Sequence, residues 1–302
     1  MPLGTPTRIT IVEVAPRDGL QAEDRVLSTD LKLELLERLA DAGHIAIEAT
    51  SFVSPKAVPQ LADAEELMRR LKPRAGVRYT ALVPNETGLE RAISSGVHEI
   101  AVFASASESY SRKNLNRSRD DALAGYGPVI RKAKDARLRV RGYLSMVIAD
   151  PWDGPTDSAV VRAAAKQLLD FGCDELSLGD TLGVGTPGDV IRLVAAMRDI
   201  PVQKLAFHFH DTYGQALANV LAAMSEGVTT FDASVGGIGG SPFAKMAGGN
   251  LATEDVLWMC TGMGIETGLD LDKLVATSHW LGDQLGRELP AHVSRAMRST
   301  RN

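Results

Sequence analysis

Cysteine is scarce in this sequence, because Cys173 and Cys260 are the only two and they lie far apart. A disulfide framework and a zinc site built from paired cysteines are therefore excluded, and a reducing compartment is expected. No run of about 18 apolar residues occurs, and residues 1–8 lack the pattern of a signal or transit peptide. We therefore expect a cytoplasmic protein that neither spans a membrane nor is exported.

An excess of positive charge is also missing, since 33 Lys and Arg stand against 38 Asp and Glu, a net charge of −5. This balance argues against nucleic acid or an anionic membrane as a partner. With 44% hydrophobic and 24% charged residues, the composition is that of an ordinary globular protein. A length of 302 residues suits two domains or one barrel of roughly 250 residues with additions.

A helix, a glycine and a short β-rich run recur along the chain. The glycines read as helix stops, and the apolar residues before them have helical spacing. Leu31, Leu35, Leu36 and Leu39 are one such set. The stops are Gly43, Gly76, Gly96, Gly172 and Gly227. The eight expected strands cover residues 9–14, 45–50, 77–83, 97–104, 138–146, 174–179, 204–210 and 228–235.

Strands that alternate with helices must pair in parallel, either in a closed (β/α)₈ TIM barrel or in an open doubly wound sheet. Polar residues at the ends of the strands favour the barrel, because a barrel gathers these ends on the one face where its active site lies. We therefore predict a single TIM-barrel domain over residues 1–302, with two further helices closing the chain after about residue 251. The polar residues in question are Arg17, Asp18, Glu48, Arg141, Tyr143, Asp180, Thr181, His208, His210, Asp232 and Ser234.

His208 and His210 are two residues apart on an expected strand, so their imidazoles point the same way. Such a pair is either a set of metal ligands or one core histidine with an exposed neighbour. The carboxylate of Asp18 at another strand end favours a divalent metal. Because the candidate ligands include oxygen donors and no cysteine, Mg²⁺ or Mn²⁺ is preferred over Zn²⁺.

Arg17 adjoins Asp18, so its guanidinium is expected near the metal, where it could hold a carboxylate or stabilise an enolate oxygen. The alternative is an ion pair with Glu13 or Glu48 that only closes the barrel. Glu48 itself could orient Arg17 or accept a proton.

Two glycine-rich segments and one basic cluster have separate interpretations. Residues 183–188 match G-x-G-x-x-G but lack the surroundings of a dinucleotide site, so we expect a flexible loop at the barrel mouth. Residues 236–244 are expected to form a lid over substrate. Arg112, Lys113, Arg117 and Arg119 read as a solvated helix start or as a site for the phosphates of an acyl-CoA.

Five segments, in order along nearly the whole chain, closely resemble the 3-hydroxy-3-methylglutaryl-CoA lyase family. They are VAPRDGLQ (14–21), EATSFVSPK (48–56), SLGDT (177–181), HFHDTYGQALAN (208–219) and GNLATED (249–255). The resemblance implies a metal-dependent TIM-barrel lyase that cleaves 3-hydroxy-3-methylglutaryl-CoA (HMG-CoA) to acetyl-CoA and acetoacetate. It also implies a homodimer. The related synthases often carry a long C-terminal regulatory domain, for which this chain is too short.

Roles for individual residues follow from the same resemblance. Arg17 matches the residue that stabilises the enolate, and the implied metal ligands are Asp18, His208, His210 and Asn250. Asp18 and His208 are also expected to serve in proton transfer. Further active-site positions of the family match Glu48, Asn114, Arg141, Tyr143 and Asp180.

Ser241 marks a departure from the family, whose glycine-rich lid normally carries a catalytic cysteine at this position. A serine hydroxyl does not titrate near pH 8.5 as a thiol does, so Ser241 is an altered catalytic group. Lys245 in the same loop is a second departure. These departures keep two further functions open: a related lyase or aldolase for another 3-hydroxy acid or acyl-CoA, such as citramalyl-CoA, and a catalytically silent protein that binds metal and a CoA ester.

Overall fold

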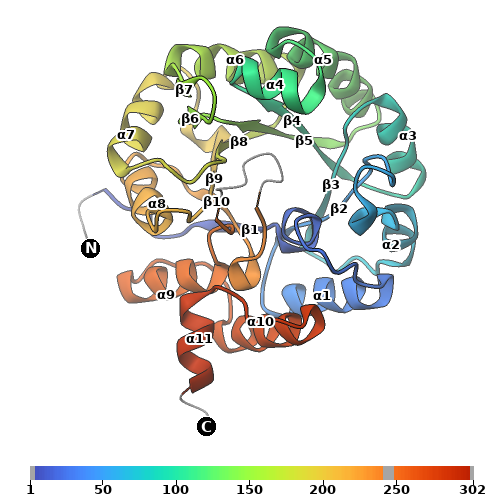
Figure 1. Ribbon diagram of the computed structural model, residues 1–302, viewed down its shortest axis with the longest axis vertical. Helices are drawn as coiled ribbons and strands as arrows, with labels where there is room; N and C mark the ends of the chain where they lie inside the picture. Colours follow the sequence, from blue (N-terminus) through green and yellow to red (C-terminus); the bar gives the residue numbers. More distant parts are fainter. Residues whose placement is uncertain (1–3, 241–247, 300–302) are drawn as a thin grey trace.

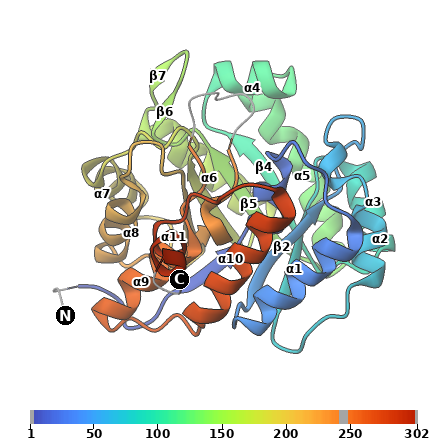
Figure 2. The same ribbon diagram turned by 60° about the horizontal axis from the view of Figure 1, so that its bottom comes forward.

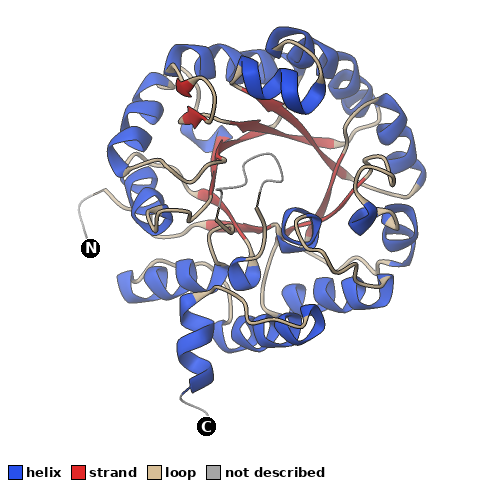
Figure 3. Cartoon of the chain, viewed as in Figure 1, coloured by secondary structure: helices blue, strands red, loops and turns tan. Residues whose placement is uncertain are grey.

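The eight long strands form a closed parallel barrel with helices around it (Figures 1 and 3). The structure is a computed structural model that describes residues 4–240 and 248–299. Around the barrel the strands follow the order β1-β10-β9-β8-β5-β4-β3-β2. The strands are β1 (Thr10–Glu13), β2 (Ala46–Ser51), β3 (Arg78–Leu82), β4 (Glu99–Ser105), β5 (Arg139–Ser145), β8 (Glu175–Asp180), β9 (Leu205–Phe209) and β10 (Thr230–Ala233).

The barrel closes where β1 pairs with both β10 and β2. Val12 lies opposite Asp232 on one side, and Glu13 lies opposite Ile47 on the other. All residues of β2, β8 and β9 are buried, as expected for strands covered on both faces. The TIM barrel expected from the sequence is therefore confirmed, and the open sheet is excluded.

The helices pack their apolar faces on the outside of the strands. In α1, Leu35, Leu36 and Leu39 are fully buried, and the helix begins where the Ser28 hydroxyl accepts from the amide of Leu31. The helices that follow strands of the barrel are α1 (Thr29–Asp41), α2 (Ala64–Arg70), α3 (Glu86–Ser94), α4 (Glu108–Leu115), α5 (Arg119–Asp135), α6 (Ser158–Phe171), α7 (Pro187–Ala196), α8 (Ala216–Ser225) and α9 (Thr253–Met263).

All five glycines predicted to stop helices have positive φ, from 78° at Gly96 to 118° at Gly172. This left-handed conformation costs a glycine little, which explains the repeated glycine before β2, β3, β4, β8 and β10. The predicted helix stop is therefore confirmed at Gly43, Gly96, Gly172 and Gly227, whereas Gly76 lies in a turn six residues after the end of α2.

Three helices, not the two predicted, lie after residue 251 within the described chain. Beyond α9 come α10 (Leu271–Leu285) and α11 (His292–Ser299). Pro290 lies in the connection between them, and α11 is too short to give a strong periodic signal in the sequence. No helix within residues 4–240 and 248–299 is both long and apolar enough to cross a lipid bilayer.

A small antiparallel hairpin, β6 (Ala149–Asp150) and β7 (Gly154–Pro155), interrupts the connection from β5 to α6. Figure 2 shows this hairpin and α4 standing above the barrel at the same end. The sequence did not predict it, because each strand is only two residues long. Hydrogen bonds from Ser107 to Asp150 and from Ser109 to Asp153 join the hairpin to the start of α4.

Candidate active site

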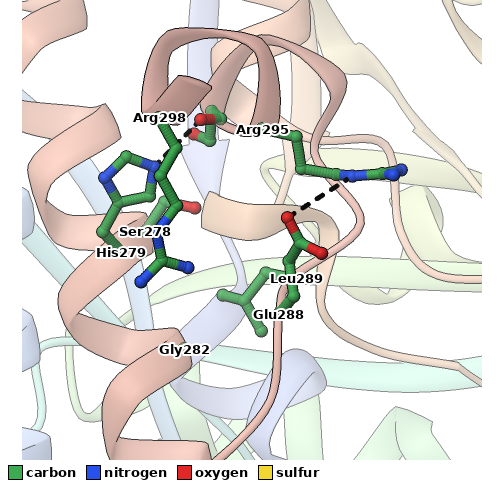
Figure 4. A pocket seen from close by; sticks show the side chains of 8 residues that line it. Ser278, His279, Gly282, Glu288, Leu289, Arg295 and Arg298 are labelled. Carbon is green, nitrogen blue, oxygen red and sulfur yellow. Dashed lines mark hydrogen bonds and ion pairs between the residues drawn. The ribbon is translucent and has the colours of Figure 1, made fainter. Parts of the chain in front are cut away.

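A cavity of about 620 Å³ opens at the C-terminal ends of the barrel strands, a size that suits a small-molecule ligand. Its floor carries Arg17, Asp18, Tyr143, His208 and His210. A second hollow between α10 and α11 holds only about 10 Å³, roughly one water, and is lined by residues such as His279, Glu288 and Arg295 (Figure 4). The larger cavity is therefore the candidate site.

Asp18, His208 and His210 form the one group of His, Cys, Asp or Glu residues in the described chain that is arranged to hold a metal ion. One ligand atom from each lies within 4.8 Å of the others. The two Nε2 atoms of the histidines are 3.3 Å apart, and Nε2 of His208 is 3.9 Å from Oδ2 of Asp18. The imidazoles come from the end of β9, where alternation places both on the same face.

Asp18 reaches this position through a π-helical turn, η1 (Ala15–Gly19), directly after β1. The carbonyl oxygen of Val14 accepts from the amides of Arg17, Asp18 and Gly19. A Cβ atom on Gly19 would lie 2.6 Å from the Ile238 side chain, so glycine is required where this turn meets the glycine-rich segment. A π-type turn of this kind is common at functional sites.

Asn250 supplies a fourth group next to the triad. Its Nδ2 donates to Oδ2 of Asp18 at 2.8 Å and to the carbonyl oxygen of Ile238 at 3.1 Å. Its buried Oδ1 has no hydrogen-bond partner among the described atoms. Two imidazole nitrogens, a carboxylate and a free amide oxygen fit a divalent cation, since an unpaired buried oxygen is otherwise costly.

The surroundings of the triad keep Asp18 and His210 in the forms that bind metal, whereas the hydrogen bond to Asp232 and the charge of Asp18 outweigh burial and raise the pKa of His208. Burial would raise the pKa of Asp18, but Arg17, His208 and His210 outweigh it, and that pKa lies below its ordinary value. Burial, helped by the neighbouring His208, lowers the pKa of His210 to about 4. At neutral pH, Asp18 is therefore a carboxylate and His210 a neutral imidazole.

Arg17 forms two ion pairs, with Oδ1 of Asp18 at 2.5 Å and with Oε2 of Glu48 at 2.7 Å. Its guanidinium also lies 5.4 Å from the centre of the Tyr143 ring. Of the two ion-pair partners considered from the sequence, the structure selects Glu48 rather than Glu13. Arg17 also lines the cavity, and its Nε is buried without a hydrogen-bond partner among the described atoms.

Glu48 and Tyr143 hold the guanidinium from the inside of the barrel. Glu48 is fully buried and accepts from the hydroxyl of Tyr143 at 3.1 Å. Burial raises the pKa of Glu48 above its ordinary value, although Arg17 beside it acts in the opposite direction. Only Tyr143 of these two lines the cavity.

Neither Arg141 nor Asp180 is among the described residues that line the cavity. Each is 1% exposed. Arg141 pairs with Glu175 and Asp232, whereas Asp180 accepts from the amides of Val184 and Gly185. The expected loop at 183–188 is thus tied to Asp180, and α7 begins at Pro187.

Two further expected site residues cannot be placed by their side chains. Asn114 belongs to α4, but its side chain is outside the described atoms. Ser241 and Lys245 both fall in residues 241–247, which are outside the described chain. In the basic cluster, Arg112 pairs with Glu108 at 2.7 Å. However, Arg112 and Lys113 lie in the last turn of α4, so the predicted helix start holds only for Arg119, where α5 begins.

The sequence did not single out the apolar part of the cavity wall. Leu82 and Phe103 come from the ends of β3 and β4, and Gln21 follows the π-helical turn. Alternation along these strands could have identified Leu82 and Phe103 as inward-facing. The loop after β2 adds Val53, Ala57, Val58 and Pro59.

Comparison with known proteins agrees with this geometry. A family model described as HMGL-like matches residues 8–281. The chain is 48% identical to the mitochondrial hydroxymethylglutaryl-CoA lyase of Arabidopsis thaliana over 94% of its own length, and it spans 61% of that protein. It is also 46% identical to the 3-hydroxy-3-isohexenylglutaryl-CoA/hydroxy-methylglutaryl-CoA lyase of Pseudomonas aeruginosa, covering 98% of this chain and 99% of the relative.

Solved structures give the same result. The crystal structure of hydroxymethylglutaryl-CoA lyase from Pseudomonas aeruginosa matches with a TM-score of 0.96 at 45% identity, over 99% of this chain and 100% of that one. The predicted fold and the predicted enzyme class, a carbon–carbon lyase, are confirmed. The chain therefore belongs to the HMGL-like family.

Proposed function

We propose that this protein is a divalent-metal-dependent lyase that cleaves HMG-CoA to acetyl-CoA and acetoacetate. The observation that carries the proposal is the placement of Asp18, His208 and His210 beside Arg17 on the floor of a ligand-sized cavity. Relatives that share 46–48% of residues with this chain are named as hydroxymethylglutaryl-CoA lyases. The geometry and the names point to the same chemistry.

The reaction breaks the bond between C2 and C3 of the acyl group. The C3 hydroxyl loses its proton and becomes the ketone of acetoacetate, while the bonding electrons pass to C2 and form the enolate of acetyl-CoA. A proton delivered to C2 completes acetyl-CoA. Two groups of opposite character are therefore needed: a base near the hydroxyl and a cation near the thioester oxygen.

Asp18, His208, His210 and Asn250 would hold the metal, and a divalent ion there lowers the pKa of the bound hydroxyl and orients the substrate. We assign proton transfer at the hydroxyl to Asp18, because His208 has no free nitrogen when its Nδ1 donates to Asp232 and its Nε2 holds the metal. The proposed ligands include carboxylate and amide oxygens but no thiolate. This set favours Mg²⁺ or Mn²⁺.

Arg17 is the group proposed to stabilise the enolate oxygen, because its guanidinium carries a fixed positive charge and the residue lines the cavity. Glu48 and Tyr143 keep the guanidinium in place. Ser241 is the proposed counterpart of the family's catalytic cysteine, and Asn114 is a proposed contact to substrate. Asp180 acts at a distance in this proposal, since it ties residues 184–185 beside the cavity.

A longer branched substrate is a second candidate, favoured by the apolar side of the cavity. Val53, Val58, Leu82 and Phe103 line it, and a branched hydrocarbon chain would pack favourably against such a surface. The Pseudomonas aeruginosa relative is named for a 3-isohexenyl substrate as well as the methyl one. Cleavage of citramalyl-CoA is a third candidate function, and silent binding of metal and a CoA ester is a fourth.

Cleavage of three thioesters separates these candidates. Metal-stripped protein is assayed with HMG-CoA, its 3-isohexenyl analogue and citramalyl-CoA, with Mg²⁺, Mn²⁺ or EDTA. The proposal predicts metal-dependent cleavage of HMG-CoA, and the second candidate predicts a higher kcat/KM for the isohexenyl analogue. Binding of metal and thioester without product would support the silent protein. A single barrel domain, a homodimer and a cytoplasmic location stay predictions from the sequence.

A further inference from the structure

A network of charged side chains lies inside the barrel beneath the metal site. Arg141 of β5 donates from Nε to Oε1 of Glu175 and from Nη2 to Oδ1 of Asp232, both at 2.7 Å. Oδ2 of Asp232 lies 3.2 Å from Nδ1 of His208. It also accepts from the hydroxyl of Ser177 at 2.7 Å. The network thus connects β8, β5, β10 and β9 and ends at His208, a proposed metal ligand.

Stability alone does not explain this arrangement. The side chains of Arg141 and Asp232 are 1% and 0% exposed, so both charges have lost their hydration. Well-packed apolar residues in place of a buried ion pair are often neutral or stabilising. We therefore expect the network to have a functional role, and His208 is the residue on which it acts.

The two histidines are held differently on the side away from the metal position. Nδ1 of His208 faces the Asp232 carboxylate, whereas Nδ1 of His210 is 3.0 Å from the carbonyl oxygen of Gly248. A carboxylate can only accept, so Nδ1 of His208 must carry the proton. Its Nε2 then presents a lone pair toward His210 and Asp18.

We propose that Asp232 is a positioning residue that fixes the tautomer and orientation of His208 for metal binding, with Arg141 and Glu175 holding Asp232 in place. This inference rests on the proposed metal-dependent function. It gives Arg141 a part in the site without contact to substrate. Carboxylates that hold metal-bound histidines in this way raise the affinity of a site for its metal.

The first test observes the tautomer directly and needs no variant of Asp232. Protein labelled with ¹⁵N-histidine and freed of metal gives long-range ¹H–¹⁵N correlations, and the spectrum of His208→Gln assigns the His208 signals among the 6 histidines. At an alkaline pH, at which the imidazole is neutral, the proposal predicts that Nδ1 carries the proton and Nε2 does not. Protonation of Nε2 in the wild type would overturn it.

The second test measures Mn²⁺ affinity by calorimetry on metal-stripped wild type, Asp232→Asn and Ser177→Ala. An asparagine can keep an acceptor for Arg141, but its amide directs a donor at His208 and favours the wrong tautomer. We expect Asp232→Asn to lose roughly 10- to 100-fold in affinity. Ser177→Ala is the matched control, because it removes a partner of the same Oδ2 without reversing the tautomer, and it should stay near the wild type.

The two proposals fail in different ways. A wild type that does not bind Mn²⁺ would overturn the metal site itself. A wild type that binds, beside an Asp232→Asn variant of equal affinity, would overturn only the positioning role. If Asp232→Asn does not fold, the tautomer measured in the wild type decides.

Discussion

Glu13 is predicted to make the fold less stable as the pH rises. Its side chain is fully buried at the end of β1, where Oε1 accepts from the amides of Ala15 and Val235 and Oε2 from the hydroxyl of Thr253. Burial raises the pKa of Glu13 from 4.5 to about 7 despite these hydrogen bonds. The folded protein thus binds this proton more tightly than the unfolded chain does.

The sign and size of the effect follow from that difference. Stability from a raised pKa is fully present below the unfolded value of 4.5 and is lost as the pH rises through about 7. Between about pH 5 and pH 8, this single group should lower the free energy of unfolding by about 2.5 kcal/mol. Glutamine cannot ionise but keeps an acceptor oxygen and similar shape, so Glu13→Gln should lack this contribution.

Urea unfolding of wild type and Glu13→Gln at several values between pH 5 and pH 8 measures the effect. Groups distant from Glu13 titrate equally in both proteins, so the difference between their free energies of unfolding reports on Glu13 and its coupling to His44 and Glu254. We expect Glu13→Gln to gain about 2.5 kcal/mol relative to wild type across the range. Glu266→Gln, at an exposed ion pair with Arg8, is the control and should show no such slope. A difference that stays constant with pH, or falls, would refute the reasoning.

Three further predictions concern the site. Asp18→Ala or His210→Ala should abolish metal binding with little change in fold, since both side chains lie at the cavity; undiminished metal in elemental analysis would exclude them as ligands. Arg17→Lys should lower kcat roughly 100-fold with a smaller change in KM, because an ammonium lacks the planar set of donors; a kinetic change confined to KM would contradict its role at the enolate. Ser241→Cys should raise HMG-CoA turnover if serine is a weak substitute for the thiol, and no gain would show that the lid serves another chemistry.

The barrel and much of its floor could be predicted from sequence because the signals are local. A glycine before five of the eight strands and polar residues at strand ends depend on neighbouring residues only. His208 and His210 followed from alternation along one strand, and their proximity to Asp18 followed from the convergence of strand ends. These three side chains do lie together in the structure.

The depth of a side chain inside the barrel could not be predicted, because it depends on the stagger between strands. Arg141 and Tyr143 both point into the barrel, but Arg141 lies opposite Glu175 and Tyr143 opposite Ser177, one layer nearer the cavity. For the same reason, the sequence left open whether Glu13 or Glu48 would pair with Arg17. The register of the sheet, a property of distant residues, decides both questions.

The most direct test of the proposed function is cleavage of HMG-CoA in D₂O by wild-type protein loaded with Mg²⁺ or Mn²⁺, with the products identified by mass spectrometry. The proposal predicts equal amounts of acetoacetate and acetyl-CoA, with one deuterium in the acetyl methyl group from protonation of the enolate. Release of free CoA by hydrolysis, or no product from a protein that binds both metal and thioester, would contradict it.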